Sequence, residues 1–181
     1  MNRIKVVFLT ILISTVYNCQ AQIEVSRLQT KNFSSTGFGV FLHFDIPVSE
    51  ANYLTLEGSL AIFKKGDHHI GIAPCLVGYR YTLDGTGTGF YLEPAIGYTF
   101  GGSDILKYDG NGYPLYNEDG SEVDQKVKGP TAALGGGYML PSIPLTLGAS
   151  YKFIKVANDP SLHVFSIRLS YSITFGRRDM Y

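Results

Sequence analysis

The stretch that decides the fold is Phe165-Ser-Ile-Arg-Leu-Ser-Tyr-Ser-Ile-Thr-Phe175, near the carboxyl end of the 181-residue chain. Apolar side chains occupy every odd position of this stretch, and Ser, Arg or Thr occupies every even position. A period of two is the period of a β-strand whose two faces meet different surroundings. Strands of globular proteins are usually about five or six residues long, and this alternation is longer. The stretch therefore predicts a long strand with one apolar and one polar face.

The same alternation recurs along the chain, and no stretch after the amino-terminal segment has helical periodicity. Charged residues make up 17% of the chain, against roughly 25% in ordinary soluble proteins. The pattern predicts an all-β fold, an eight-stranded antiparallel up-and-down transmembrane β-barrel. Pro74 is expected to mark a bulge in its strand. The seven other predicted strands, the first of them weaker, cover residues 23–30, 38–46, 53–62, 75–82, 90–100, 131–140 and 145–153.

The connections between these strands differ in length at the two ends of the predicted barrel. Short connections at 47–50, 84–87 and 141–144 alternate with the segments 64–68, 103–129 and 157–162. Outer-membrane barrels have short periplasmic turns and longer extracellular loops. We therefore expect one long extracellular loop, at 103–129.

The amino-terminal segment has the plan of a secretory signal peptide. Arg3 and Lys5 precede a mostly apolar run over 6–16, and Cys19-Gln20-Ala21 offers small residues at the cleavage site. An uncleaved anchor and lipidation at Cys19 are the alternatives. The predicted division is a cleaved signal peptide at 1–21, an outer-membrane β-barrel at 22–176 and a short periplasmic tail at 177–181.

The composition of the polar face indicates which face points outward. It holds mainly Ser, Thr, Gly and Ala with few charges, which suits a narrow, crowded lumen rather than a water-exposed surface. Aromatic side chains gather toward the strand ends on the apolar face, as in an aromatic girdle. The alternative is a soluble lipocalin-like barrel with the faces inverted. The girdle residues are Tyr79, Tyr81, Tyr98, Phe100, Tyr151, Phe153, Tyr171 and Phe175.

With these features the chain, over residues 23–175, resembles the small eight-stranded outer-membrane β-barrels of the OmpX-like and OmpW-like kind, with an outer membrane protein beta-barrel domain. The strand ending at Phe175 looks like the assembly signal of this group, although residues 176–181 follow it. The resemblance implies that outer-membrane lipid and the barrel-assembly machinery, through the strand ending at Phe175, are partners. It also implies export to the outer membrane of a Gram-negative-type bacterium.

Six charged residues are predicted to form a polar cluster in the lumen, with His43 nearby. Arg80 and Glu93 flank a turn on adjacent strands, and we predict an ion pair between them. A barrel of eight strands is just wide enough for side chains to fill, so the cluster is expected to be a structural core. The alternative is a narrow path for a small solute. The cluster consists of Asp45, Glu57, Arg80, Glu93, Lys152 and Arg168.

Candidate chemical motifs are weak, and no catalytic, cofactor-binding or metal-binding residue is predicted. His163 and Ser166 lie three residues apart on a strand and point to opposite faces. His68 and His69 also diverge, and no zinc-ligand spacing completes them. Cys75 is expected to pack as a small apolar side chain on the lipid face. The 15 basic and 15 acidic residues argue against a nucleic-acid partner.

The 103–129 loop is the most informative candidate for an interaction. Loops on a rigid scaffold carry recognition, and Tyr113, Tyr116, Glu118 and Asp119 are predicted contact residues. Loosely bound calcium and a solvated loop without a ligand are alternatives. The leading hypothesis is a non-enzymatic barrel that serves envelope integrity or surface interaction. The alternatives are a narrow channel for small or amphiphilic solutes, as in the OmpW-like group, and an outer-leaflet lipid-modifying enzyme.

Overall fold

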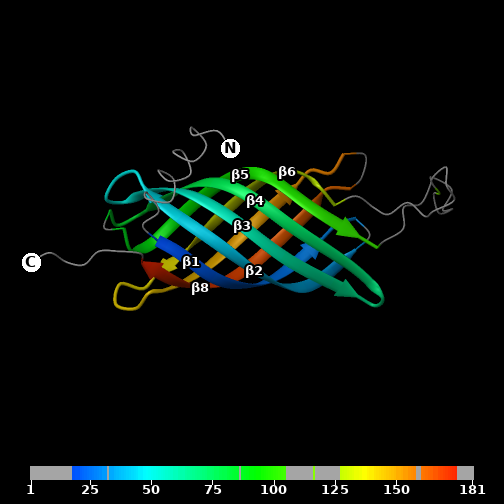
Figure 1. Cartoon of the computed structure of the whole chain (residues 1–181), viewed down its shortest axis with the longest axis horizontal. Helices are drawn as coiled ribbons and strands as arrows, with labels where there is room; N and C mark the ends of the chain where they lie inside the picture. The colour runs from blue at the N-terminus through cyan, green and yellow to red at the C-terminus, as the bar shows by residue number, and fades with distance from the viewer. Residues whose placement is uncertain are drawn as a thin grey trace, which may run out of the picture.

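The computed structural model describes residues 18–31, 33–85, 87–104, 116, 127–157 and 160–174, and these residues form a closed barrel of eight strands (Figure 1). Each strand pairs antiparallel with its neighbour in sequence, and β1 pairs with β8 to close the sheet. The predicted eight-stranded antiparallel barrel is thus confirmed. The strands are β1 Asn18–Gln29, β2 Ser34–Pro47, β3 Asn52–Lys65, β4 His68–Thr82, β5 Gly89–Ser103, β6 Gly129–Met139, β7 Leu145–Ile154 and β8 Leu162–Thr174.

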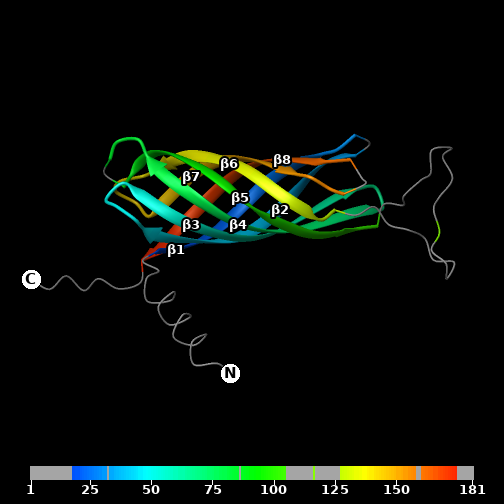
Figure 2. The same ribbon diagram turned by 90° about the horizontal axis from the view of Figure 1, so that it is seen from above.

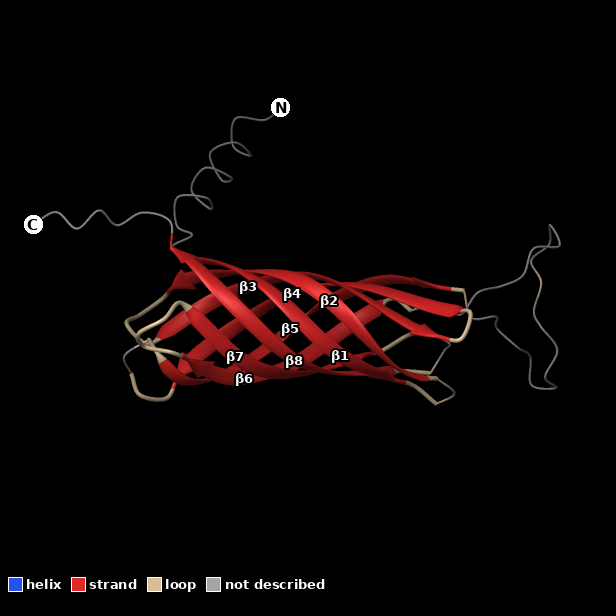
Figure 3. Cartoon of the chain, turned by 90° about the horizontal axis from the view of Figure 1, so that it is seen from below, coloured by secondary structure: helices blue, strands red, loops and turns tan. Residues whose placement is uncertain are grey.

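The barrel is elongated, and its strands run obliquely to the long axis (Figure 3). The tilt follows from closing a twisted sheet of a few strands on itself. None of the described residues belongs to a helix with the length and apolar character needed to cross a membrane.

The two ends of the barrel differ in their connections (Figure 2). We call the end with connections 48–51, 83–88 and 140–144 the turn end, and the end with connections 30–33, 66–67, 104–128 and 155–161 the loop end. Strand β1 starts and β8 finishes at the turn end, where Asn18 lies opposite Thr174. The connections 30–33 and 66–67 are as short as those of the turn end, so the expected difference in length holds only for 104–128 and 155–161. The extracellular placement of the 103–129 loop stays a prediction.

Strand β4 differs from its predicted form. It begins at His68, not Cys75, and only Gly66 and Asp67 separate it from β3. Gly66 has a φ of 62°, a left-handed conformation that glycine adopts without steric cost. The predicted bulge at Pro74 is wrong, because Gly58 lies opposite Cys75 and Ala61 opposite Ile72 in one unbroken register.

The outer face of the barrel is apolar, as the alternation predicted. Phe38 is 73% exposed, and Ile96 and Ile167 are each 71% exposed. Tyr79, Tyr81 and Tyr171 lie on this face toward the turn end, and Cys75 is exposed on it too. The soluble lipocalin-like alternative is wrong, because an apolar surface of this extent would face water.

The inner face divides into two parts along the barrel. Toward the turn end it is polar and charged, whereas toward the loop end apolar side chains fill it. The predicted polar lumen therefore holds for only part of the barrel. The second part, here called the lumen apolar cluster, consists of Leu28, Phe33, Ala61, Phe63, Ile70, Ile72, Val127, Ile154, Val156, Leu162 and Val164, each at most 7% exposed.

The predicted domain boundaries stay predictions. Strand β1 begins at Asn18, so its backbone includes residues 18–21, which the predicted cleavage after Ala21 would remove. The cleavage and the periplasmic tail at 177–181 stay predictions. Phe175, the predicted assembly-signal residue, lies outside the described residues.

Candidate functional site

The first part of the charged lumen is centred on Arg80, an inward-facing residue of β4. Its guanidinium is 3% exposed, and its Nε donates to Glu93 Oε2 at 2.8 Å. Its Nη1 donates to Asp45 Oδ2 at 3.2 Å, and its Nη2 donates to His43 Nε2 at 2.8 Å. The predicted Arg80–Glu93 ion pair is therefore present. The guanidinium also stacks on the Tyr91 ring, 4.6 Å from its centroid.

The second part of the charged lumen is centred on Glu57, an inward-facing residue of β3. Its carboxylate accepts two hydrogen bonds from Arg168, at 2.9 and 3.0 Å, in the paired geometry that arginine offers a carboxylate. Lys152 Nζ lies 3.0 Å from Glu57 Oε1. Glu24 adds a second acid, 3.3 Å from Arg168 Nε and 3.9 Å from Lys152 Nζ. All four residues therefore form one buried network.

Glu24 is the member of the network that the sequence reasoning missed. It lies on β1, whose alternation is weak, and no inner or outer face was assigned within the predicted strand at 23–30. The alternation of polar residues at Gln22, Glu24 and Ser26 could have revealed it. All three side chains are buried in the lumen. Among the described residues, the lumen thus holds four carboxylates against three permanent cations, with His43 as the remaining basic group.

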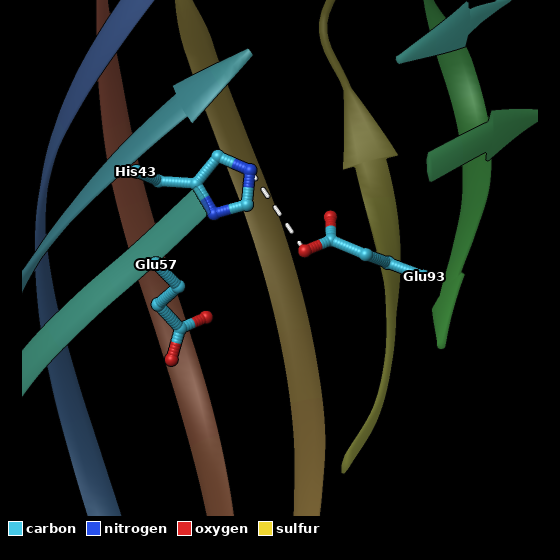
Figure 4. Close-up of side chains that lie close together, drawn as sticks. All are labelled: His43, Glu57 and Glu93. Carbon is cyan, nitrogen blue, oxygen red and sulfur yellow. Dashed lines mark ion pairs between the residues drawn. The ribbon is translucent and has the colours of Figure 1, made fainter. Parts of the chain in front are cut away.

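The arrangement of these acids bears on whether the lumen can hold a metal ion. Ligand atoms of His43, Glu57 and Glu93 lie within 4.8 Å of one another (Figure 4). However, the same carboxylates already face cations, because Arg80 donates to Glu93 and Lys152 and Arg168 contact Glu57. The geometry is that of an ion-pair network in which each buried charge has a partner of opposite sign.

The charged lumen is reached from the turn end. A pocket of about 330 Å³ there is lined by Tyr53, Asp45 and Arg80, together with residues of the 140–144 turn. At the opposite end, the lumen apolar cluster covers the network. Phe63, Ile154 and Leu28 in that cluster are each 0% exposed. The charged lumen is therefore open toward the turn end and packed with apolar side chains toward the loop end.

The loop end carries a small exposed polar contact. The His69 backbone N–H donates to Asp104 Oδ1 at 2.6 Å, and His69 Nδ1 lies 3.0 Å from Asp104 Oδ2. The pKa of the Asp104 carboxyl lies below its usual range, first because the His69 N–H donates to it. His68 Nδ1 is 3.8 Å from Asp104 Oδ1. Both histidines therefore lie near one carboxylate, although their side chains were expected to diverge.

The predicted loop contacts lie mostly outside the described residues. Tyr116 is described and is 57% exposed, whereas Tyr113, Glu118 and Asp119 are not described. His163 and Ser166 point to opposite faces of β8, as predicted. His163 Nδ1 lies 2.7 Å from the Tyr151 hydroxyl, and Ser166 pairs with Ser26 in the lumen.

Known structures share this fold at low sequence identity. Ail of Yersinia pestis, in complex with the heparin analogue sucrose octasulfate, has a TM-score of 0.60 and 13% identity, over 87% of this chain and 99% of that chain. Neisserial surface protein A has a TM-score of 0.56 and 14% identity, over 88% of this chain and 97% of that chain. The outer membrane enzyme PagL has a TM-score of 0.51 and 12% identity, over 84% of this chain and 100% of that chain. At these identities the likeness shows the fold alone.

The sequence itself matches a family. The profile of the outer membrane protein beta-barrel domain matches residues 14–172, which include nearly all of the eight strands. A comparison with curated proteins gave no match. The family and the apolar outer face together place the barrel in the outer membrane. The chain belongs to the outer membrane protein beta-barrel domain family.

Proposed function

We propose that this protein is a sealed, non-enzymatic outer-membrane barrel that serves envelope integrity or surface interaction through its 103–129 loop. The observation that carries the proposal is the lumen apolar cluster. Its side chains are at most 7% exposed, so this part of the lumen is packed like a protein core, and we expect no passage for water between its described residues.

The charged lumen supports a structural role in the same way. Arg80, Glu57 and their partners satisfy one another at 2.8–3.2 Å across six strands. A partly unsatisfied network would cost stability, whereas a satisfied one makes the interior rigid and specific. We infer that this network holds the barrel as a rigid scaffold for the loop end.

The enzyme alternative has less support. The fold hosts at least one enzyme, PagL, so the fold does not decide the question. In this chain His163 contacts Tyr151 on the outer side, and Ser166 contacts Ser26 inside the lumen. A nucleophile and its base need hydrogen-bond contact, and these two side chains are on opposite faces of the sheet.

Planar-bilayer recording of the refolded protein tests the sealed lumen. We expect no single-channel steps from the wild-type barrel. Phe63→Gly with Ile70→Gly, which removes two buried apolar side chains, should introduce measurable leak. Steady conductance of the wild-type protein would contradict the proposal and favour the narrow-channel alternative.

Deletion of residues 105–126 tests the role of the loop. The shortened barrel should still show a heat-dependent gel shift, because both strands flanking the loop remain. Cells that carry it should become more sensitive to detergent. In the full-length protein, a photoreactive residue at Tyr116 should form crosslinks to a surface partner. The control carries the photoreactive residue at Phe90, which is 63% exposed on the lipid face. Unchanged sensitivity together with equal crosslinking from both positions would contradict the loop role.

A further inference from the structure

A row of polar residues crosses the outer face of β1, β2 and β3 near the loop end. Arg27 lies opposite Thr36, and the β2–β3 register that pairs Gly37 with Phe63 brings Lys64 opposite Thr36. The Ser35 hydroxyl donates to the Lys64 carbonyl, which agrees with that placement. All three side chains of the row are exposed. Two strand spacings of about 4.8 Å separate Arg27 from Lys64, so their backbones lie roughly 10 Å apart.

The next row toward the turn end is wholly apolar. Val25, Phe38 and Ile62 lie opposite one another on the same three strands. They are 47%, 73% and 56% exposed. Two residues along a strand span about 6.6 Å, so the outer face changes from apolar to cationic within that distance. A bilayer makes the same change where its acyl chains end and its headgroups begin.

A groove on the outer face reaches the polar row from the side. It has a volume of about 650 Å³, and its lining includes Phe165, Ile167 and Ala149 in addition to Arg27 and Thr36. The small side chain of Ala149 leaves the surface low between larger apolar neighbours. The groove is therefore apolar along most of its length and ends at the cationic side chain of Arg27.

The charge of the described residues around the polar row favours an anion at this place. The exposed cations of the described loop end are Arg27, Lys31, Lys64, Lys65, Lys128 and Lys155. The exposed acids there are Asp67 and Asp104, and His69 already contacts Asp104. Basic residues at a membrane surface attract anionic headgroups.

We propose that Arg27 and Lys64 bind the phosphate of a membrane phospholipid at the loop end, whose acyl chain lies in the groove beside Ala149. The arginine fork and the lysine ammonium approach the phosphate from two strands, with Thr36 between them. The acyl chain covers Val25, Phe165 and Ile167. This site requires only the membrane location of the barrel, so its failure would leave the proposed surface function untouched.

Native mass spectrometry of the intact barrel, released from neutral detergent with phosphatidylglycerol added, tests the phosphate contact. The double variant Arg27→Gln/Lys64→Gln should bind the lipid roughly 30-fold more weakly, at about 1 kcal/mol for each basic residue. The matched control is Lys128→Gln/Lys155→Gln, which removes the same charge at the same end, in the connections next to β6 and β7. An equal loss in both double variants would mean diffuse attraction and would overturn the site.

A second pair of variants tests the acyl chain. Ala149→Leu fills the groove and should weaken lipid binding, whereas Ala132→Leu adds the same bulk at an exposed position of the lipid face outside the groove lining. Equal binding by these two variants would overturn the assignment of the groove. Complete displacement of the lipid by millimolar inorganic phosphate would show that the site takes a free anion instead. A heat-dependent gel shift verifies that each variant is folded.

Discussion

Replacement of Glu57 by glutamine removes the carboxylate that Lys152 and Arg168 share. Lys152 Nζ lies 3.0 Å from Glu57, and the Lys152 and Glu57 side chains are 1% and 5% exposed. At an effective dielectric constant near 20, two unit charges at that separation attract by roughly 5.5 kcal/mol. After the variant, only Glu24 remains to balance two cations, at 3.3 and 3.9 Å. One buried positive charge is then uncompensated.

Breaking one partner of a buried ion pair typically costs about 3–5 kcal/mol, and we expect Glu57→Gln to lower the free energy of unfolding by that amount. The double variant Glu57→Gln/Arg168→Gln leaves Glu24 opposite Lys152 and restores the balance. Its loss should therefore fall short of the sum of the two single losses by about 0.5–3 kcal/mol.

Equilibrium urea unfolding in lipid vesicles, followed by far-ultraviolet circular dichroism, measures these losses. Circular dichroism is suitable because the chain has no tryptophan for fluorescence. The matched control is Glu50→Gln, an exposed acid in a turn, which should change stability by no more than about 0.5 kcal/mol. A loss below about 1 kcal/mol for Glu57→Gln, or strict additivity in the double variant, would refute the reasoning.

Three further predictions follow from burial and exposure. Phe63→Ala should cost about 3–5 kcal/mol in the same unfolding assay, because Phe63 is 0% exposed in the lumen apolar cluster; a near-zero cost would mean that the cluster is not packed. Ile96→Arg, at a lipid-facing position 71% exposed near the middle of β5, should cost about 2–4 kcal/mol. Phe100→Arg, nearer the loop end, should cost about 0–1 kcal/mol, and equal costs at both positions would contradict the predicted depth. The depressed pKa of Asp104 means that its contact with His69 holds at neutral pH and is lost as the pH falls through that pKa; an amide titration by nuclear magnetic resonance should show a shift at His69 that Asp104→Asn abolishes.

Several features of the fold could be predicted because they are local. The alternation in β8 assigned Arg168 to the inside and Ile167 to the outside, and both assignments hold. A strand turns successive side chains to opposite faces whatever its partners are. The Arg80–Glu93 ion pair could also be predicted, because the two residues flank one short connection between neighbouring strands.

Other features were missed because the local signal was ambiguous. Ile70 and Ile72 lie on the first part of β4. This part lies outside the predicted strand at 75–82, because it contains Pro74 and two adjacent histidines, His68 and His69. Their burial shows that the lumen is apolar toward the loop end. Period two separates two faces but does not say which of them must be polar, so an inward row of isoleucines was not expected.

The alternation of residues along the chain is enough to assign the class of this protein. Long strands with one apolar face and one face of small polar residues require a closed sheet in lipid, because every backbone group in the hydrocarbon must be paired. Which inward residues contact one another depends on the closed barrel. Closure places β1 beside β8, so Glu24 contacts Arg168 across 144 positions of sequence. Such a contact depends on the register and tilt of the whole barrel, and no local pattern encodes those.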